Sequence, residues 1–313
     1  MILDQCWQWR VESAKTTLQG SYTNGFGSMQ RVEPRLAAAL NDVVARPGSM
    51  LRAVTSYLVG MAMGLGEDAA RAVACGIEYL HTSSLVFDDL PAMDDARTRR
   101  GAACVHVVHG EAIAVLAALA LINRGYALLW QGINRAADPA RRELAGHWLD
   151  ARLGPCGLIG GQAFDLRGWR GEQSAAEVSE VAARKTGELL RLTLTLPAII
   201  GHGTAREIQL LDRLALLRGL AYQVADDLKD VLAQEENHGK TGGRDEELGR
   251  PNMVAAEGVA ATILRFQRLQ HLGDRVARTL PDIPGRWEML KLLRVAMPDG
   301  MTEDFLATAP AAG

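Results

Sequence analysis

Residues 73–95 read VACGIEYLHTSSLVFDDLPAMDD, and their pattern predicts the fold class. Its apolar residues recur at the spacing of one helical face, at Val73, Ile77, Leu80 and Leu85. Because proline disfavours helical backbone in the residue before it, Pro91 predicts a helix end just ahead of it. Asp88 and Asp89 then lie on the last helical turn, and Asp94 returns from the following loop. The stretch therefore predicts a helix with carboxylates at its C-terminal end.

The rest of the chain is also patterned for helices. Glycine and proline divide it mostly into segments of 15 to 30 residues, which suits helices better than strands. With 6 Trp, 5 Tyr and 5 Phe in 313 residues, we expect Ala and Leu, both good helix formers, to fill the core. Residues 190–196 differ, because Leu alternates there with Arg or Thr at the period of a half-buried strand. Since no second strand is available to pair with them, we predict a helix there too, with Pro197 as a kink or a stop.

Charge, length and cysteine spacing exclude several classes of protein. The 34 basic and 37 acidic side chains give a net charge of −3, which argues against general nucleic-acid binding. The longest apolar run, residues 112–122, is too short to span a bilayer, and the N-terminus lacks the pattern of a signal peptide. The four cysteines show no C-x-x-C spacing, so neither a zinc site nor a redox dithiol is indicated. We therefore expect a soluble, cytoplasmic protein without a transmembrane segment.

The positions of glycine and other turn-forming residues also predict the domain boundaries. Gly, Ser and Asn cluster between residues 20 and 28, which indicates that residues 1–30 are a mobile lead-in before the folded body. We expect one all-α domain over residues 31–308 and a short tail at residues 309–313.

A second acidic cluster lies in the other half of the chain. Gln223, Asp226, Asp227 and Asp230 stand at offsets 0, 3, 4 and 7, which places them on one helical face. Two carboxylates about 4 Å apart repel each other by about 4 kcal/mol at an effective dielectric constant of about 20, so a cation is needed to compensate. Hard ions such as Mg²⁺ prefer oxygen ligands and complete their shells with water and substrate phosphates.

The alternative interpretation of each cluster is a solvated acidic face. Both clusters, however, lie within apolar helical stretches, where full solvation is not expected. Basic residues also follow each cluster closely, at Arg97, Arg99 and Arg100 in the first case and at Lys240 and Arg244 in the second. Metal ions combined with fixed cations indicate a diphosphate site.

These motifs resemble the trans-isoprenyl diphosphate synthases of the farnesyl and geranylgeranyl diphosphate synthase type. The form Asp88-Asp89-x-x-x-x-Asp94 before Arg99-Arg100-Gly101 is similar to the first aspartate-rich motif of that family. The form Gly219-x-x-Tyr222-Gln223-x-x-Asp226-Asp227-x-x-Asp230 is similar to the second. Further matches in family order are His81-Thr82, Gly161-Gln162-x-x-Asp165, Lys185-Thr186 and Gly239-Lys240-Thr241.

The resemblance implies an all-α bundle of the isoprenoid synthase type around a deep central cavity, assembled as a homodimer. It implies about three Mg²⁺ ions on the diphosphate of an allylic substrate, bound by six aspartates: Asp88, Asp89, Asp94, Asp226, Asp227 and Asp230. Arg99, Lys185 and Lys240 would hold the leaving diphosphate, and Gln162 is a further substrate-binding candidate. The carbonyls of Lys185 and Thr186 and the side chain of Gln223 would face the allylic cation, which isopentenyl diphosphate attacks.

The sequence departs from this family at the site for isopentenyl diphosphate. The family carries Gly-Gly-Lys-Arg-x-Arg-Pro near its N-terminus, whereas residues 47–53 read PGSMLRA here. Arg52, His81 and Arg100 would remain for that diphosphate, and each lost charge-assisted contact costs about 1.5–3 kcal/mol. Two alternatives therefore stay open: a terpene cyclase-like enzyme or diphosphatase of the same fold, and a non-catalytic subunit of a synthase heterodimer.

Product length is predicted from two small residues. In the family, bulky aromatic residues four and five positions before the first aspartate close the floor of the cavity, and here those positions hold Ser84 and Ser83. Small side chains about one helical turn below Asp88 leave the pocket open. We therefore expect a product longer than fifteen carbons, namely geranylgeranyl diphosphate.

Overall fold

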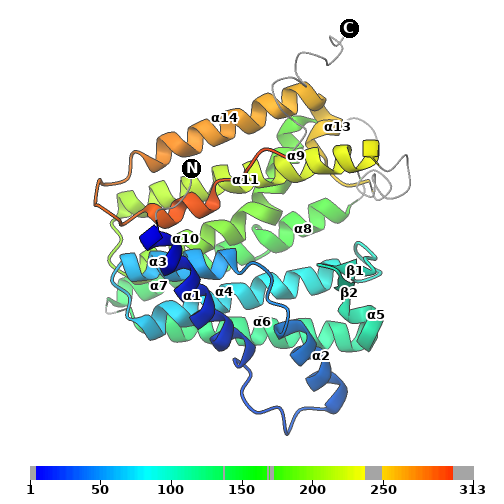
Figure 1. Ribbon diagram of the computed structural model, residues 1–313, viewed down its shortest axis with the longest axis vertical. Helices are drawn as coiled ribbons and strands as arrows, with labels where there is room; N and C mark the ends of the chain where they lie inside the picture. The colour runs from blue at the N-terminus through cyan, green and yellow to red at the C-terminus, as the bar shows by residue number, and fades with distance from the viewer. Residues whose placement is uncertain (1–4, 137, 168, 170–172, 237–248, 299–313) are drawn as a thin grey trace. The chain divides into compact units, whose positions relative to one another are not determined.

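The computed structural model describes residues 5–136, 138–167, 169, 173–236 and 249–298 (Figure 1). Helices make up nearly all of the regular structure in these residues, and the strands found there are two residues long each. The all-α class predicted from the sequence is therefore confirmed.

The elements follow one another in a simple order. The first nine are α1 (Gln5–Thr23), α2 (Pro34–Val44), α3 (Leu51–Ala62), α4 (Glu67–Asp88), β1 (Thr98–Arg99), β2 (Ala102–Ala103), α5 (Val105–His109), α6 (Glu111–Ile133) and α7 (Pro139–Leu153). They are followed by α8 (Leu158–Leu166), α9 (Ala175–Ala182), the π-helical turn η1 (Ala183–Gly187), α10 (Glu188–Ile200), α11 (Ala205–Glu236), α13 (Met253–Glu257), α14 (Val259–Ala277) and the 3₁₀ helix η2 (Glu288–Leu293). β1 and β2 form an antiparallel hairpin in which Thr98 faces Ala103.

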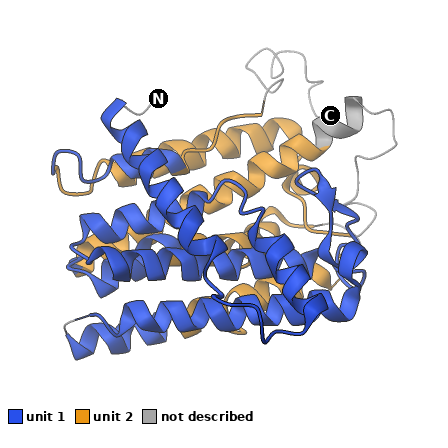
Figure 2. Ribbon diagram, turned by 60° about the horizontal axis from the view of Figure 1, so that its bottom comes forward, with its two compact units in different colours: residues 1–148, 193–204, 283–292 blue, residues 149–192, 205–282, 293–313 orange. Residues whose placement is uncertain are grey.

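The chain groups into two units, which have different colours in Figure 2. Unit 1 comprises residues 1–148, 193–204 and 283–292, and unit 2 comprises residues 149–192, 205–282 and 293–313. The single domain expected over residues 31–308 and its central cavity stay predictions. The expected tail at residues 309–313 lies outside the described residues.

In unit 1, α4 packs along α6 and also contacts α1 and α3 (Figure 1). α4 begins with Glu67 and Asp68 in its first turn, where the helix dipole favours carboxylates, and it ends at Asp88 as Pro91 predicts. α6 is long and apolar enough to cross a membrane, but its most apolar window of 18 residues is 44% buried within the fold. One such helix is weak evidence for a membrane span, and a core helix fits α6 as well.

The N-terminal helix corrects the prediction of a mobile lead-in over residues 1–30. Residues 5–23 form α1, with a buried face made of Trp7, Ala14, Leu18 and Tyr22. This face packs against α3 and α4. The Tyr22 ring stacks on Tyr79 with a centroid distance of 4.6 Å, and the Tyr79 hydroxyl donates a hydrogen bond to the Tyr22 carbonyl oxygen at 2.5 Å. α1 is therefore part of the folded body of unit 1.

The alternating stretch at residues 190–196 lies within α10, which confirms the predicted helix. Leucines and threonines are equally inaccessible there, since Leu194 and Thr195 are both 0% exposed. A helix that is buried on all sides has no polar face, so the spacing of its leucines does not report its secondary structure. Pro197 lies inside the helix, which continues to Ile200, so the stop is wrong.

Unit 2 is built around α11, with α13 and α14 packed against it. Its core cluster contains Val178, Ala221, Val224, Ala225, Leu228, Met253, Ile263 and Phe266. The α11 residues of this cluster recur at the spacing of one helical face, and Asp226 on the other side of α11 is exposed. The core therefore fixes the face of α11 that carries the second acidic cluster.

Candidate active site

The first aspartate motif lies where α4 ends. Asp88 is the last residue of α4, and the following loop folds back so that the backbone N–H of Asp94 donates to the Asp88 carbonyl oxygen at 2.9 Å. The backbone N–H of Ala96 donates to the Asp89 carbonyl oxygen at 3.2 Å. Asp88 and Asp94 are half-buried, whereas Asp89 is only 4% exposed. The loop thus returns Asp94 to the helix end, as the sequence predicts.

The β1–β2 hairpin supplies the cations next to this motif. Arg100 and Gly101 occupy its turn with φ angles of 54° and 76°, the positive values that a tight two-residue hairpin requires. Arg99, on β1, donates from Nε to Asp89 Oδ1 at 2.6 Å. The expected compensation of carboxylates at a helix C-terminus is therefore present within unit 1.

Arg52 and His81 lie together beside the first motif. Arg52 Nη1 is 3.1 Å from His81 Nε2. Because a guanidinium group only donates, Nε2 accepts and the ring proton of the neutral imidazole is assigned to Nδ1. Burial, followed by the charges of Arg52, Arg100 and Arg99, holds the pKa of His81 well below its usual value of 6.5. His81 is therefore neutral at pH 7 and offers a hydrogen bond rather than a charge.

Gly48 leaves room for Arg100 near Arg52 and His81. Its φ angle is 69°, and a Cβ atom at this position would lie 2.2 Å from Arg100 Nη1. Arg100 Nη1 also donates to the Arg46 carbonyl oxygen at 3.5 Å. Gly48 is the glycine retained from the family's Gly-Gly-Lys-Arg-x-Arg-Pro element. Because it has no side chain, Arg100 can approach the loop. The structure thus brings together Arg52, His81 and Arg100, the three residues predicted for isopentenyl diphosphate.

Glu78 was missed by the sequence reasoning. It is 2% exposed, and its Oε2 accepts from the backbone N–H of Ala53 at 3.3 Å. Burial raises the pKa of Glu78, partly offset by Arg52, the Ala53 N–H and Arg100. α3 has no side-chain cap of its own at Met50, so Glu78 satisfies one of its first N–H groups from α4. The sequence signal that could have identified Glu78 is an acidic residue one helical turn before His81 in a mostly apolar helix.

The two serines that we connect with product length have satisfied hydroxyls. Ser83 is buried and donates to the Leu80 carbonyl oxygen at 2.7 Å. Ser84 is half-buried and donates to the His81 carbonyl oxygen at 2.9 Å. Neither hydroxyl therefore needs a partner outside α4, and both serines leave small apolar surfaces.

In unit 2, Lys185 lies against Asp165. Lys185 belongs to η1, and its Nζ donates to Asp165 Oδ2 at 2.5 Å. The contact depends on Gly161 of α8, because a Cβ atom there would lie 2.4 Å from the Lys185 backbone nitrogen. π-helical turns occur often at functional sites, and this one holds both residues of the Lys185-Thr186 element. Gln162 is half-buried on α8, three residues before Asp165.

A hydrogen-bonded chain links η1 to the second aspartate motif. The Thr186 hydroxyl donates to Gln223 Oε1 at 2.9 Å, and Gln223 Nε2 donates to Asp227 Oδ1 at 3.0 Å. The backbone N–H of Met253 donates to Asp227 Oδ2 at 2.8 Å. Asp227 is 1% exposed. The amide of Gln223 is therefore held in one orientation between a hydroxyl and a buried carboxylate.

Arg250 is the second residue that the sequence reasoning did not select. It is 7% exposed, its Nη1 donates to the Asp165 carbonyl oxygen at 3.2 Å, and its Nε lies 3.9 Å from Asp165 Oδ2. Asp165 thus contacts two cations, Lys185 and Arg250.

The remaining predicted residues are placed as follows. Asp226 and Asp230 are exposed on α11, while Lys240 lies outside the described residues. Among the described residues, no group of three or more His, Cys, Asp or Glu side chains is arranged to hold a metal ion. Asp88, Asp89 and Asp94 belong to unit 1, and the three aspartates of the second motif belong to unit 2. Their convergence into one cage stays a prediction.

Residues 33–275 match the polyprenyl synthetase family. The chain belongs to that family. This polyprenyl synthetase is 37% identical to a farnesyl diphosphate synthase from Geobacillus stearothermophilus over 191 residues, which cover 60% of the chain and 64% of the relative. It is 34% identical to a geranylgeranyl diphosphate synthase from Cereibacter sphaeroides over 290 residues, which cover 91% of the chain and 93% of that protein. The chain thus spans less than two thirds of the first relative and nearly all of the second.

Solved structures agree with the fold of this polyprenyl synthetase. A geranyltransferase from Helicobacter pylori, complexed with magnesium and isoprenyl diphosphate, superposes with a TM-score of 0.77 at 26% identity. The match covers 90% of this chain and 94% of the geranyltransferase. The predicted relationship to isoprenyl diphosphate synthases is therefore confirmed at the level of family and fold.

Proposed function

We propose that this polyprenyl synthetase condenses an allylic diphosphate with isopentenyl diphosphate and that its product is geranylgeranyl diphosphate. One observation carries the proposal. In each aspartate motif one carboxylate is buried and hydrogen-bonded within its own unit, while the others are more exposed. Such motifs hold their outer carboxylates in place for a ligand, and both relatives are named as synthases of prenyl diphosphates.

The donor set suits Mg²⁺ that is completed by substrate. Mg²⁺ usually takes one or two protein carboxylates and fills its other positions with water and phosphate oxygens. Asp88 and Asp94 in one unit, and Asp226 and Asp230 in the other, would hold the ions with the diphosphate between them. In the bound state the metal lowers the barrier to departure of the diphosphate by neutralising its charge. The Helicobacter pylori geranyltransferase, with magnesium and isoprenyl diphosphate bound, supports the choice of metal.

The fixed cations of the chain would assist the same departure. Arg99 is bound to Asp89, and Lys185 is bound to Asp165, so each ammonium or guanidinium is oriented before substrate arrives. Gln223 Oε1, which accepts from Thr186, would face the allylic cation together with the backbone carbonyls of Lys185 and Thr186. The double bond of isopentenyl diphosphate then attacks the cation, and the departed diphosphate takes the final proton.

The site for isopentenyl diphosphate would use the group beside His81. Arg52 and Arg100 supply two guanidinium groups, and neutral His81 supplies a hydrogen bond. Met50 stands where the family has a basic residue, and it is 1% exposed with a φ angle of 52°. Because Met50 fills its position with an apolar side chain, we expect weaker binding of isopentenyl diphosphate than in relatives with the full element.

The direct test supplies the purified chain with Mg²⁺ and farnesyl diphosphate, with and without radiolabelled isopentenyl diphosphate. We expect a labelled twenty-carbon diphosphate that forms only when both substrates are present. A cyclic hydrocarbon or a free prenyl alcohol without isopentenyl diphosphate would instead identify a cyclase or a diphosphatase. No turnover, with activity restored only by a second synthase chain, would identify a non-catalytic subunit.

Replacing Ser84 with Phe tests the chain-length part of the proposal. The aromatic ring would occupy the space about one helical turn below Asp88, so the main product should shorten by at least one five-carbon unit. Chromatography of the dephosphorylated products measures this shift. Unchanged product length in both Ser84→Phe and Ser83→Phe would show that another position closes the pocket.

We also propose that the protein is a cytoplasmic homodimer in which the exposed side of α6 is covered by a second copy. This side carries Leu116, Leu119 and Trp130, which are 49%, 50% and 46% exposed. Light scattering during gel filtration should give twice the chain mass, and Leu119→Lys should lower it to one chain. Leu264→Lys, on an α14 leucine that is 57% exposed, is the matched control and should leave the mass unchanged. A monomeric wild-type protein would contradict the proposal.

A further inference from the structure

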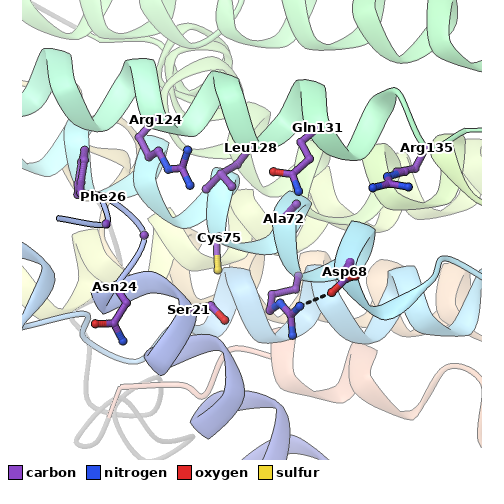
Figure 3. Close-up of a pocket in the computed structure, with 13 residues that line it drawn as sticks. Ser21, Asn24, Phe26, Asp68, Ala72, Cys75, Arg124, Leu128, Gln131 and Arg135 are labelled. Atoms are coloured by element: carbon purple, nitrogen blue, oxygen red, sulfur yellow. Dashed lines mark hydrogen bonds and ion pairs between the residues drawn. The ribbon is translucent and has the colours of Figure 1, made fainter.

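A separate cavity of about 690 Å³ lies within unit 1, and its lining includes no residue of either aspartate motif (Figure 3). Its walls come from the end of α1 and the following segment, from the first half of α4, and from the second half of α6. A volume of this size is within the range of small-molecule sites, about 300–1,000 Å³. No part of the proposed reaction uses this cavity.

One face of α6 forms the upper wall of the cavity in Figure 3. The residues that line it are Arg124, Leu128, Gln131 and Arg135, at intervals of four, three and four. This is the spacing of one helical face, continued by Arg135 just beyond the helix end. In Figure 3, the side chains of Arg124, Leu128 and Gln131 point from α6 toward α4.

The charges that line the cavity are unbalanced. Arg71 contributes a third guanidinium, which is paired with Asp68 and with Glu67 at 3.3 Å. Neither Arg124 nor Arg135 has an ion-pair partner among the described residues. The buried Nε of Arg124 also has no hydrogen-bond partner within that part of the chain. Since three arginines face one acid in the lining, the cavity favours an anion.

The lining also offers an apolar surface. Phe26, Ala72 and Cys75 contribute to it together with Leu128 of α6, and Asn24 and Ser21 add neutral hydrogen-bonding groups. An inorganic anion alone would leave this surface in contact with water. A ligand that carries an apolar ring or short chain beside its negative group would cover it and gain from burial.

The helical geometry of α4 separates this cavity from the proposed substrate pocket. Cys75 precedes Ser84 by nine residues, and at about 100° per residue the two side chains point to opposite sides of α4. They also lie about 13 Å apart along the helix axis. A ligand in the cavity therefore does not occupy the space that Ser84 leaves for the growing prenyl chain.

We propose that this cavity binds a small organic anion, a phosphate monoester or a carboxylate with a compact apolar group. The anion lies between Arg124 and Arg135, and the apolar group lies against Phe26 and Leu128. The bound ligand connects α1, α4 and α6, so it stabilises unit 1. This proposal does not depend on the proposed prenyl transfer.

Calorimetric titration of the full chain with 1-naphthyl phosphate tests the proposal. The buffer contains EDTA, so that metal-dependent diphosphate binding does not contribute. Parallel titrations use 1-naphthoate, 1-naphthol and inorganic phosphate. We expect saturable binding of the two aromatic anions at one site per chain, with no heat from 1-naphthol and at least about tenfold weaker binding of inorganic phosphate. The stronger of the two aromatic anions identifies which oxyanion the site prefers.

Variants locate the site. Arg124→Gln and Arg135→Gln should each weaken naphthyl phosphate binding by about tenfold, since each removes one charge-assisted contact. Arg268→Gln, on an exposed arginine of α14, is the matched control and should bind like the wild type. Circular dichroism and the melting temperature of each variant check that it is folded.

Three results would overturn the proposal. One is binding that is unchanged in the Arg124→Gln, Arg135→Gln double variant. Another is binding that is lost in Arg52→Gln instead, which would place the ligand beside His81. Absence of any saturable binding by both aromatic anions to the folded protein also contradicts it.

Discussion

The two aspartate motifs are built differently. In the first, the buried carboxylate of Asp89 is bound by a charged group, Arg99, whose side chain is 36% exposed. In the second, the buried carboxylate of Asp227 is bound by neutral donors, the Gln223 amide and the Met253 backbone N–H. The first motif sits at a helix end with a returning loop, whereas the second lies within the long helix α11.

The difference shows how one chemical pattern can be supported in two ways. At the end of α4 the helix dipole is unfavourable to carboxylates, and a cation compensates for it. Along α11 no such end effect acts on Asp227, and the Gln223 amide and the Met253 N–H, both neutral, donate hydrogen bonds to it. In both motifs the buried carboxylate is bound by groups of the protein itself, which leaves the outer aspartates as the candidates for metal binding.

Replacing the outer aspartates should cause the greatest loss of activity. Asp88→Asn and Asp226→Asn should each lower kcat by about a thousandfold, since each removes a negative metal ligand at the diphosphate. Melting temperatures should change little, because neither carboxylate is fully buried. Asp95→Asn is the control in the same loop, since Asp95 is exposed and Asn tolerates its φ angle of 47°. Equal activity of Asp88→Asn and Asp95→Asn would contradict the assignment of Asp88 as a metal ligand.

The next effect is on the free energy of unfolding, which the two buried aspartates should lower by different amounts when they are replaced. Asp227→Ala leaves the buried Met253 N–H unpaired, so it should lower the free energy of unfolding by about 1–3 kcal/mol. Asp89→Ala should lower it less, because the partly exposed Arg99 can turn to solvent. Urea denaturation measures both, with Asp230→Ala as the exposed control. A larger loss for Asp89→Ala than for Asp227→Ala would reverse the account of the two motifs.

The smallest effect is a pH dependence of the free energy of unfolding, and it arises in unit 1, where His81 lies. His81 has a depressed pKa in the folded protein, so below about pH 6.5 the unfolded chain binds a proton that the folded chain does not. Stability should therefore fall as the pH is lowered from 6.5, by at most about 1.4 kcal/mol per pH unit. Glu78, whose pKa is raised, acts in the opposite direction above its usual value of 4.5.

The His81 contribution is isolated by comparing variants. The free energy of unfolding of the wild type minus that of His81→Gln should decline between pH 6.5 and 5.5, because Gln does not titrate. The same difference measured in an Asp227→Ala background should show the same slope. A difference that is flat with pH would show that His81 is not held neutral.

Several elements could be predicted because their causes are local in sequence. Pro91 fixes the end of α4, and helical spacing places Gln223 and Asp227 on one face, where they form a hydrogen bond. Motif order identified Arg52, His81 and Arg100, which the structure brings together.

Other features depend on partners that are distant in sequence. Arg250 gains its role from Asp165, 85 residues away, and Glu78 from a backbone N–H 25 residues away. α1 was missed because its buried Leu18 and Tyr22 stand among polar residues next to a Gly, Ser and Asn cluster, so its apolar face is narrow. Local patterns do not report such contacts.

The central claim is that carboxylates from both motifs bind one diphosphate through shared metal ions. Calorimetric titration with a farnesyl thiodiphosphate, which resists ionisation, tests it in the presence and absence of Mg²⁺. Asp88→Ala and Asp226→Ala should each abolish the Mg²⁺-dependent binding, and the double variant should bind no worse than either single variant, because one site is lost in all three. Mg²⁺-dependent binding that survives in Asp226→Ala, or losses that add in the double variant, would contradict the claim.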